Sequence, residues 1–161
     1  MKLPLRKFIP GLFLALALMQ LIRPQQTNPP VDPAQTVHAA LSDAPAVASH
    51  LERACTDCHS YQTVWPWYSN VAPASWLISY DVNKGRRKLN FSDWAAYSPE
   101  QNQKLLKRIC KEVSEGDMPQ FQYTLLHPQS KLTAGEAQEI CRWTETAAQK
   151  LSTMIEEPQK D

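Results

Sequence analysis

The chain has 161 residues, of which 43% are hydrophobic and 20% are charged, so it can form a packed core and is not expected to be disordered or to cross a membrane many times. It holds 13 Pro but only 4 Gly, which favours an α-rich domain behind a Pro-rich lead, because β-rich folds need more Gly at their turns. From Pro24 onward 13 basic residues face 16 acidic ones, so this part carries a net charge of −3 and nucleic acid is not the expected partner.

The N-terminus has the pattern of an export signal. Residues 8–22 are uncharged and mostly Leu, Ala, Phe and Ile, and three basic residues precede them. The Ala-x-Ala at 15–17 lies inside this apolar run, so we expect residues 1–23 to stay as a signal anchor instead of being cleaved. An apolar helix of this length measures about 22 Å against about 30 Å of hydrocarbon, so the flanking basic side chains would have to snorkel. The charge asymmetry predicts a domain on the periplasmic side.

The next segment, RPQQTNPPVDPAQTVHAALSDAP, contains five prolines and little apolar material. It predicts an extended tether over residues 24–44 with no core of its own. Beyond it we expect one domain over residues 45–155 and a C-terminal tail over residues 156–161.

Helical periodicity and start signals predict four main helices in the domain, joined by aromatic-rich loops. Their expected ranges are about 45–55, 73–84, 98–116 and 133–155. Ser98 and Thr133 each begin a capping box, and Gly85 is expected to end the second helix. The expected fold class is all-α.

One motif carries the chemistry: Cys55-Thr56-Asp57-Cys58-His59 is Cys-x-x-Cys-His, the attachment signature of c-type haem. Two thiols one helical turn apart can each form a thioether with a haem vinyl group. His59 then presents its imidazole to the iron as the proximal ligand. We therefore expect one covalently attached haem c held by Cys55 and Cys58.

Two other sites use closely spaced cysteines. A structural zinc site needs a second close pair of ligands, whereas the remaining cysteines, Cys110 and Cys141, stand far from the motif and 31 positions apart. A thioredoxin-like redox pair needs a preceding strand, whereas the residues before Cys55 have helical spacing.

The stretch CTDCHSYQTVWPWYSNVAPASWLISYDVNKGRRKLNFSDW, together with GDMP, YTLLHP, KLTAGE and ICRW further on, resembles the bacterial haem-binding domain family. This family consists of small single-haem proteins of cytochrome c type, usually with an N-terminal membrane segment. The resemblance covers nearly all of residues 50–145. It implies a cytochrome c-like helical bundle around one haem, with Cys55 and Cys58 as attachment points and His59 as proximal ligand.

The residues after the motif are unusually aromatic. These rings are expected to form much of a small core, and we expect Trp65 or Trp67 to wall the haem as well. The basic run at residues 86–88 is more typical of a solvated helix end than of a clamp for the haem propionates.

We predict Met118 as the distal iron ligand. The other three methionines belong to the N-terminal segment or to the end of the last helix. Gly116 can end the third helix and Pro119 biases Met118 toward an extended backbone, so the thioether would project from a loop. Its position between His59 and the final helix resembles the order in class I cytochromes c. His127 is the alternative ligand.

Cys110 and Cys141 each lie on the apolar stripe of a predicted helix. In an oxidising compartment two facing thiols are expected to form a disulfide. The alternative is that each is a small buried core residue.

A haem whose two axial positions are filled by protein can exchange electrons but offers no substrate site. The expected function is therefore that of a membrane-anchored, exported monohaem cytochrome acting in electron transfer with redox protein partners, and not that of an enzyme. The alternatives are a haem enzyme or sensor (peroxidase-like or gas-binding) with a displaceable distal ligand, or a haem subunit of a larger redox complex.

Overall fold

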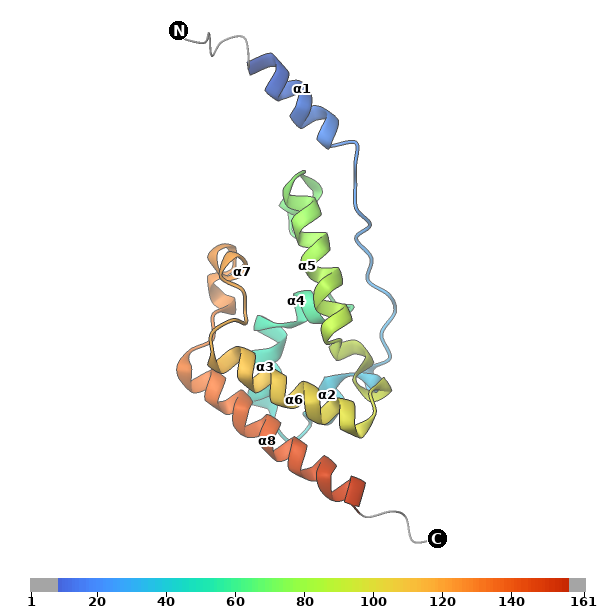
Figure 1. The fold of residues 1–161 in the computed structure, drawn as a ribbon, viewed down its shortest axis with the longest axis vertical. Coiled ribbons are helices and arrows are strands. Elements are labelled where there is room, and N and C mark those ends of the chain that lie inside the picture. The colour runs from blue at the N-terminus through green and yellow to red at the C-terminus, as the bar shows by residue number, and fades with distance from the viewer. Residues whose placement is uncertain (1–8, 157–161) are drawn as a thin grey trace.

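The computed structural model describes residues 9–156 (Figure 1), so residues 1–8 of the predicted anchor and residues 157–161 of the predicted tail lie outside it. Within this range the chain forms helices and loops without a strand, which confirms the all-α class. The longer helices are α1 (Ile9–Met19), α3 (Pro45–Ala54), α5 (Ala74–Lys88), α6 (Pro99–Ser114) and α8 (Ala134–Glu156). The shorter elements are α2 (Val37–Ala40), α4 (Thr56–His59), α7 (Phe121–Leu126) and the 3-10 turns η2 (Pro33–Gln35), η3 (Trp67–Asn70), η4 (Phe91–Ala96) and η5 (Pro128–Ser130).

Helix α1 lies within the apolar segment that was predicted as a signal anchor and is 11 residues long. Between residues 9 and 156, none of the helices combines the length and the apolar character needed to span a membrane.

Helices α6 and α8 form the base of the domain, lying side by side and running in opposite directions (Figure 1). Both begin at the predicted capping boxes: Ser98 Oγ accepts the Gln101 N–H at 3.3 Å, and Thr133 Oγ1 accepts the Glu136 N–H at 3.3 Å. The predicted disulfide is confirmed, and it joins these helices with 4.6 Å between the two cysteine Cα atoms. This pair therefore forms a cross-linked platform for the remaining elements.

The core connects this platform to α3 and η4. Leu51, Phe91, Leu106 and Ile140 are each at most 2% exposed and belong to one apolar cluster. Burying a side chain of this size stabilises the fold by roughly 1.5–3 kcal/mol.

Part of the predicted tether is helical and contributes to this core, so residues 24–44 are not extended throughout. Val37 and Leu41 are 0% and 2% exposed and belong to the same cluster. Val37 begins the short helix α2 and Leu41 directly follows its last residue. Helix α2 packs against η4. Two apolar residues within a polar, Pro-rich segment are too few to give a recognisable helical pattern.

Residues 20–28, which we call the strap, begin with a turn after α1 and then run along the domain without regular secondary structure (Figure 1). The Gln20 side chain exchanges two hydrogen bonds with the backbone of Ala72, at 2.9 and 3.2 Å. The Trp76 indole donates to the Ile22 carbonyl at 2.8 Å, and the Asn28 amide donates to the Thr63 carbonyl at 2.9 Å. The strap is therefore attached to the domain along its length.

Arg86 links the strap to the Cys-x-x-Cys-His region. Its guanidinium donates to the Thr27 carbonyl at 2.7 Å, to Asn28 Oδ1 at 2.9 Å and to the Ser60 carbonyl at 2.7 Å. The prediction of a solvated basic run at residues 86–88 is thus wrong for Arg86, because its charge is satisfied by acceptors from two distant segments.

Helix α5 continues to Lys88 and does not end at Gly85 as predicted. Gly85 is buried because α5 crosses directly over the backbone of α4. A Cβ at this position would lie 3.0 Å from the Cys58 carbonyl carbon and closer still to its oxygen. Glycine therefore serves a close helix contact here.

Candidate cofactor site

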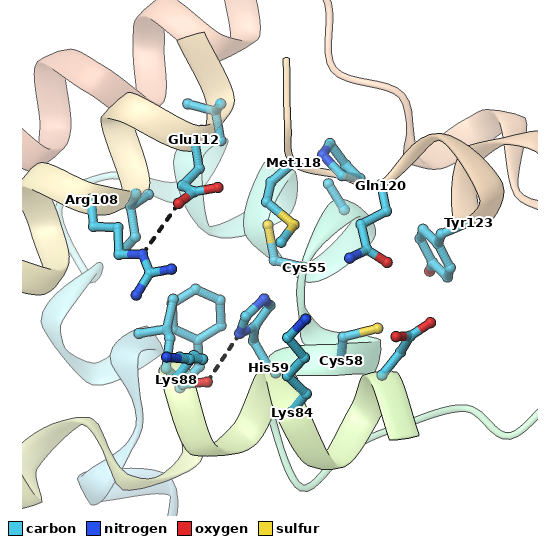
Figure 2. A pocket seen from close by; sticks show the side chains of 18 of the residues that line it. Cys55, Cys58, His59, Lys84, Lys88, Arg108, Glu112, Met118, Gln120 and Tyr123 are labelled. Atoms are coloured by element: carbon cyan, nitrogen blue, oxygen red, sulfur yellow. Dashed lines mark hydrogen bonds and ion pairs between the residues drawn. The ribbon is translucent and has the colours of Figure 1, made fainter. Parts of the chain in front are cut away.

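A cavity of about 230 Å³ opens between α4, α5, α6 and the segment from residue 118 to 123 (Figure 2). Its walls are largely apolar and include Ala54, Leu89, Phe91, Leu105, Ile109 and Val113. An apolar pocket with a few convergent polar groups is the usual form of a cofactor site.

Both motif cysteines line this cavity. Cys55 follows the last residue of α3, and one turn of helix, α4, carries Cys58 and His59 back to the same wall. The His59 N–H donates to the Cys55 carbonyl at 3.0 Å, which closes that turn. Burial raises the pKa of each of the two thiols to about 12, so both are neutral S–H groups at neutral pH.

The His59 imidazole is held in one orientation. Its Nδ1–H donates to the Leu89 carbonyl at 3.0 Å, on the side of the ring away from Met118 (Figure 2). Because a carbonyl accepts only from an N–H, this bond leaves Nε2 as the unprotonated nitrogen. Burial lowers the pKa of His59, and the Phe91 ring packs at 6.1 Å, so the imidazole is neutral and fixed, as a metal ligand must be.

Met118 lies across the cavity from His59, and its thioether points into the space between them (Figure 2). The end of α6 fixes this position. Gly116 adopts a left-handed φ of 77°, which turns the chain back so that the N–H groups of Asp117 and Met118 donate to the Glu112 carbonyl at 3.0 and 3.1 Å. Met118 is therefore held at the wall of the cavity opposite His59.

His127, the alternative ligand, does not line the cavity. Its Nδ1–H donates to the Tyr123 carbonyl at 3.1 Å and its Nε2 accepts the Tyr68 hydroxyl at 3.2 Å. Its ring is also stacked on Tyr123 with 4.4 Å between centroids. Because both ring nitrogens are engaged, this arrangement favours Met118 over His127.

The structure does not bring Trp65 or Trp67 to the cavity, contrary to the prediction. Trp67 is 78% exposed and contacts Tyr68 edge-on, because it begins the turn η3, whose buried residue is Ser69. The aromatic walls come instead from Phe91 and Tyr123, far along the chain from the motif.

Tyr123 is a site residue that sequence reasoning missed. Its hydroxyl donates to Asp57 Oδ2 at 2.7 Å, and Asp57 Oδ1 accepts the Val64 N–H at 2.9 Å. Burial in the first place raises the pKa of Tyr123 well above its usual range, so the phenol stays protonated and keeps donating. The middle residue of the motif thus ties the attachment turn to the segment after Met118, and no sequence signal marks Asp57 for this role.

These residues fit a c-type haem. Two neutral thiols, an imidazole with Nε2 unprotonated and a thioether face one largely apolar cavity. Helix α3, and not a strand, leads into the motif, so the context of a thioredoxin-like pair is missing. Among residues 9–156, no three His, Cys, Asp or Glu side chains are grouped closely enough to hold a metal ion, as a zinc site would require.

The comparisons with known proteins agree with this site. A family model described as a haem-binding domain matches residues 14–146, which is most of the chain. Neither the curated proteins nor the solved structures contain a match.

Proposed function

The chain belongs to the haem-binding domain family, and from this we propose that it is an exported monohaem cytochrome of c type that transfers electrons. The observation that carries the proposal is the placement of His59 and Met118 on opposite sides of one apolar cavity whose wall also holds Cys55 and Cys58.

The two cysteines would form the covalent attachment. Each thiol would add across a vinyl group, so that an S–C bond would form and the thiol hydrogen would move to the neighbouring carbon. No other reactant is consumed in this addition. The position of Cys55 and Cys58 supports this role, because both are free cysteines that line the cavity.

When bound, the haem supplies an iron that cycles between the ferric and ferrous states by one electron. His59 and Met118 would both bind the iron, and a haem held in this way would exchange electrons without binding a substrate at the iron. The Leu89 carbonyl holds the His59 ring, and the hydrogen bonds to the Glu112 carbonyl hold the Met118 loop. Such pre-fixed ligands favour electron transfer, because little has to move between the two oxidation states.

We also propose that the apolar segment around α1 attaches the protein to a membrane after export. The charge asymmetry around residues 8–22 supports an extracytoplasmic domain. Fractionation of cells that express the full chain tests this: the protein should stay with membranes washed at high salt and alkaline pH. Recovery in the soluble fraction would contradict the attachment.

The cofactor and the ligands are tested with the full chain produced in a host that attaches c-type haem. A pyridine haemochrome spectrum should have the absorbance of a haem with two thioether links. The ferric protein should have the weak near-infrared band of methionine ligation, and the reduced protein should not bind carbon monoxide promptly. Prompt binding by the wild type would favour the enzyme or sensor alternative.

Met118→Ala should lose the near-infrared band and bind carbon monoxide. Met154→Ala is the matched control, because Met154 is 69% exposed near the end of α8 and should leave both properties unchanged. A near-infrared band that survives in Met118→Ala would exclude Met118 as the ligand.

A further inference from the structure

Three basic side chains line the largely apolar cavity. Lys84 and Lys88 come from α5, and Arg108 comes from α6. Figure 2 shows Lys88 and Arg108 beyond the His59 ring, on the side of the cavity away from Cys58. Positive groups gathered at one edge of an apolar pocket indicate that this edge receives an anionic part of the ligand.

Lys88 and Arg108 retain unused donors. Arg108 donates through Nε to Glu112 Oε1 at 3.2 Å, while its two terminal nitrogens have no hydrogen-bond partner in the described chain. Lys88 has no ion pair within residues 9–156. Lys84 differs from them, because its ammonium lies 5.6 Å above the Tyr80 ring and the Asp81 carboxylate is near its charge.

The chemistry of haem connects these observations. Its two vinyl groups and its two propionate carboxylates lie on opposite edges of the ring. If Cys55 and Cys58 fix the vinyl edge, the carboxylates must face the opposite side of the cavity, where Lys88 and Arg108 stand. A planar guanidinium and an ammonium are both suited to binding a carboxylate.

We propose that Lys88 and Arg108 bind the two haem propionates. The inference rests on the proposed function and adds an orientation to it: the propionate edge lies between the end of α5 and the middle of α6. Each carboxylate beside a cation has a lowered pKa, because the cation favours its charged form. Loss of the cation should therefore move the titration of that carboxylate to higher pH.

The test is a redox titration of the full-length, haem-loaded protein over a range of pH, which locates the inflection at which a propionate changes its protonation state. Lys88→Gln should raise this inflection by at least about one pH unit, whereas Lys88→Arg should keep it in place. Arg108→Gln would leave Glu112 unpaired, so Arg108→Gln is made in a Glu112→Gln background. The double variant should have a higher inflection than Glu112→Gln alone, because the two proteins differ only in the Arg108 charge.

Lys107→Gln is the matched control. It removes one positive charge next to Arg108 from an exposed position that does not line the cavity, so its inflection should equal that of the wild type. The proposal is overturned if all variants load haem normally, Lys88→Gln titrates like Lys107→Gln, and the double variant titrates like Glu112→Gln. A wild type without a haemochrome spectrum would instead refute the proposed function itself.

Discussion

Gly85 lies at the close contact between α5 and α4, the two helices that carry part of the site, so Gly85→Ala tests this contact directly. The added methyl would lie 3.0 Å from the Cys58 carbonyl carbon, while ordinary contacts begin at 3.4 Å, and the neighbour is backbone that cannot rotate away. Overpacking of such a contact costs about 3 kcal/mol. Alanine is better than glycine in a helix by about 1 kcal/mol. The net loss in the free energy of unfolding is therefore about 2 kcal/mol.

The assay is thermal unfolding of the full chain, followed by circular dichroism, with wild type and variants in the same state of haem loading. The midpoint should fall by roughly 8 °C. Gly135→Ala is the matched control, because it adds the same methyl to a helix where the nearest atom, Thr133 Oγ1, would be 4.0 Å away. Its midpoint should stay the same or rise. A Gly85→Ala midpoint equal to that of the control would refute the close-contact argument.

Replacing both Cys110 and Cys141 by Ala removes a disulfide that closes a loop with a sequence separation of 31. On the chain-entropy model this should lower the free energy of unfolding, measured in urea, by about 3.7 kcal/mol. An unchanged urea midpoint would contradict this stabilisation. The pKa of Glu136 is lowered mainly by a backbone N–H at the start of α8, so its stabilisation is present above about pH 4.5 and is lost as the pH falls. The stability difference between wild type and Glu136→Gln should therefore shrink from pH 7 to pH 3, and a constant difference would argue against it. Arg86→Ala removes four hydrogen bonds and should lower the free energy of unfolding by about 3 kcal/mol. The control Arg87→Ala, at an exposed neighbouring position, should change the urea midpoint little. Equal decreases in the two variants would show that Arg86 does not link the strap to the motif region.

The helices that could be predicted are those whose sequence contains both a start signal and an apolar stripe for the core. Ser98 and Thr133 begin capping boxes, and the apolar stripes that follow them define α6 and α8. The end of α5 could not be read in the same way. A glycine near a helix end is usually a cap, and only the tertiary contact with Cys58 reveals why Gly85 is needed inside the helix.

The candidate site divides along similar lines. Cys55, Cys58 and His59 were identifiable because their spacing is chemically specific, and Met118 because few methionines could compete with it. The aromatic walls were not identifiable, because nearness in sequence to the motif does not say on which side of the chain a ring lies. Tertiary packing places the cavity-lining rings, and no local pattern encodes it.

The strap has a consequence for how the protein would work beside a membrane. A flexible linker would allow the domain to rotate freely, so that its cavity could face any direction. Hydrogen bonds along residues 20–28 instead attach this segment to the domain at Thr63, Ala72 and Trp76. If the chain before Gln20 is held in a bilayer, the strap would determine the height and the tilt of the cavity above the lipid. If the protein also transfers electrons as proposed, the distance between its cofactor and a partner in the same membrane would depend on the strap.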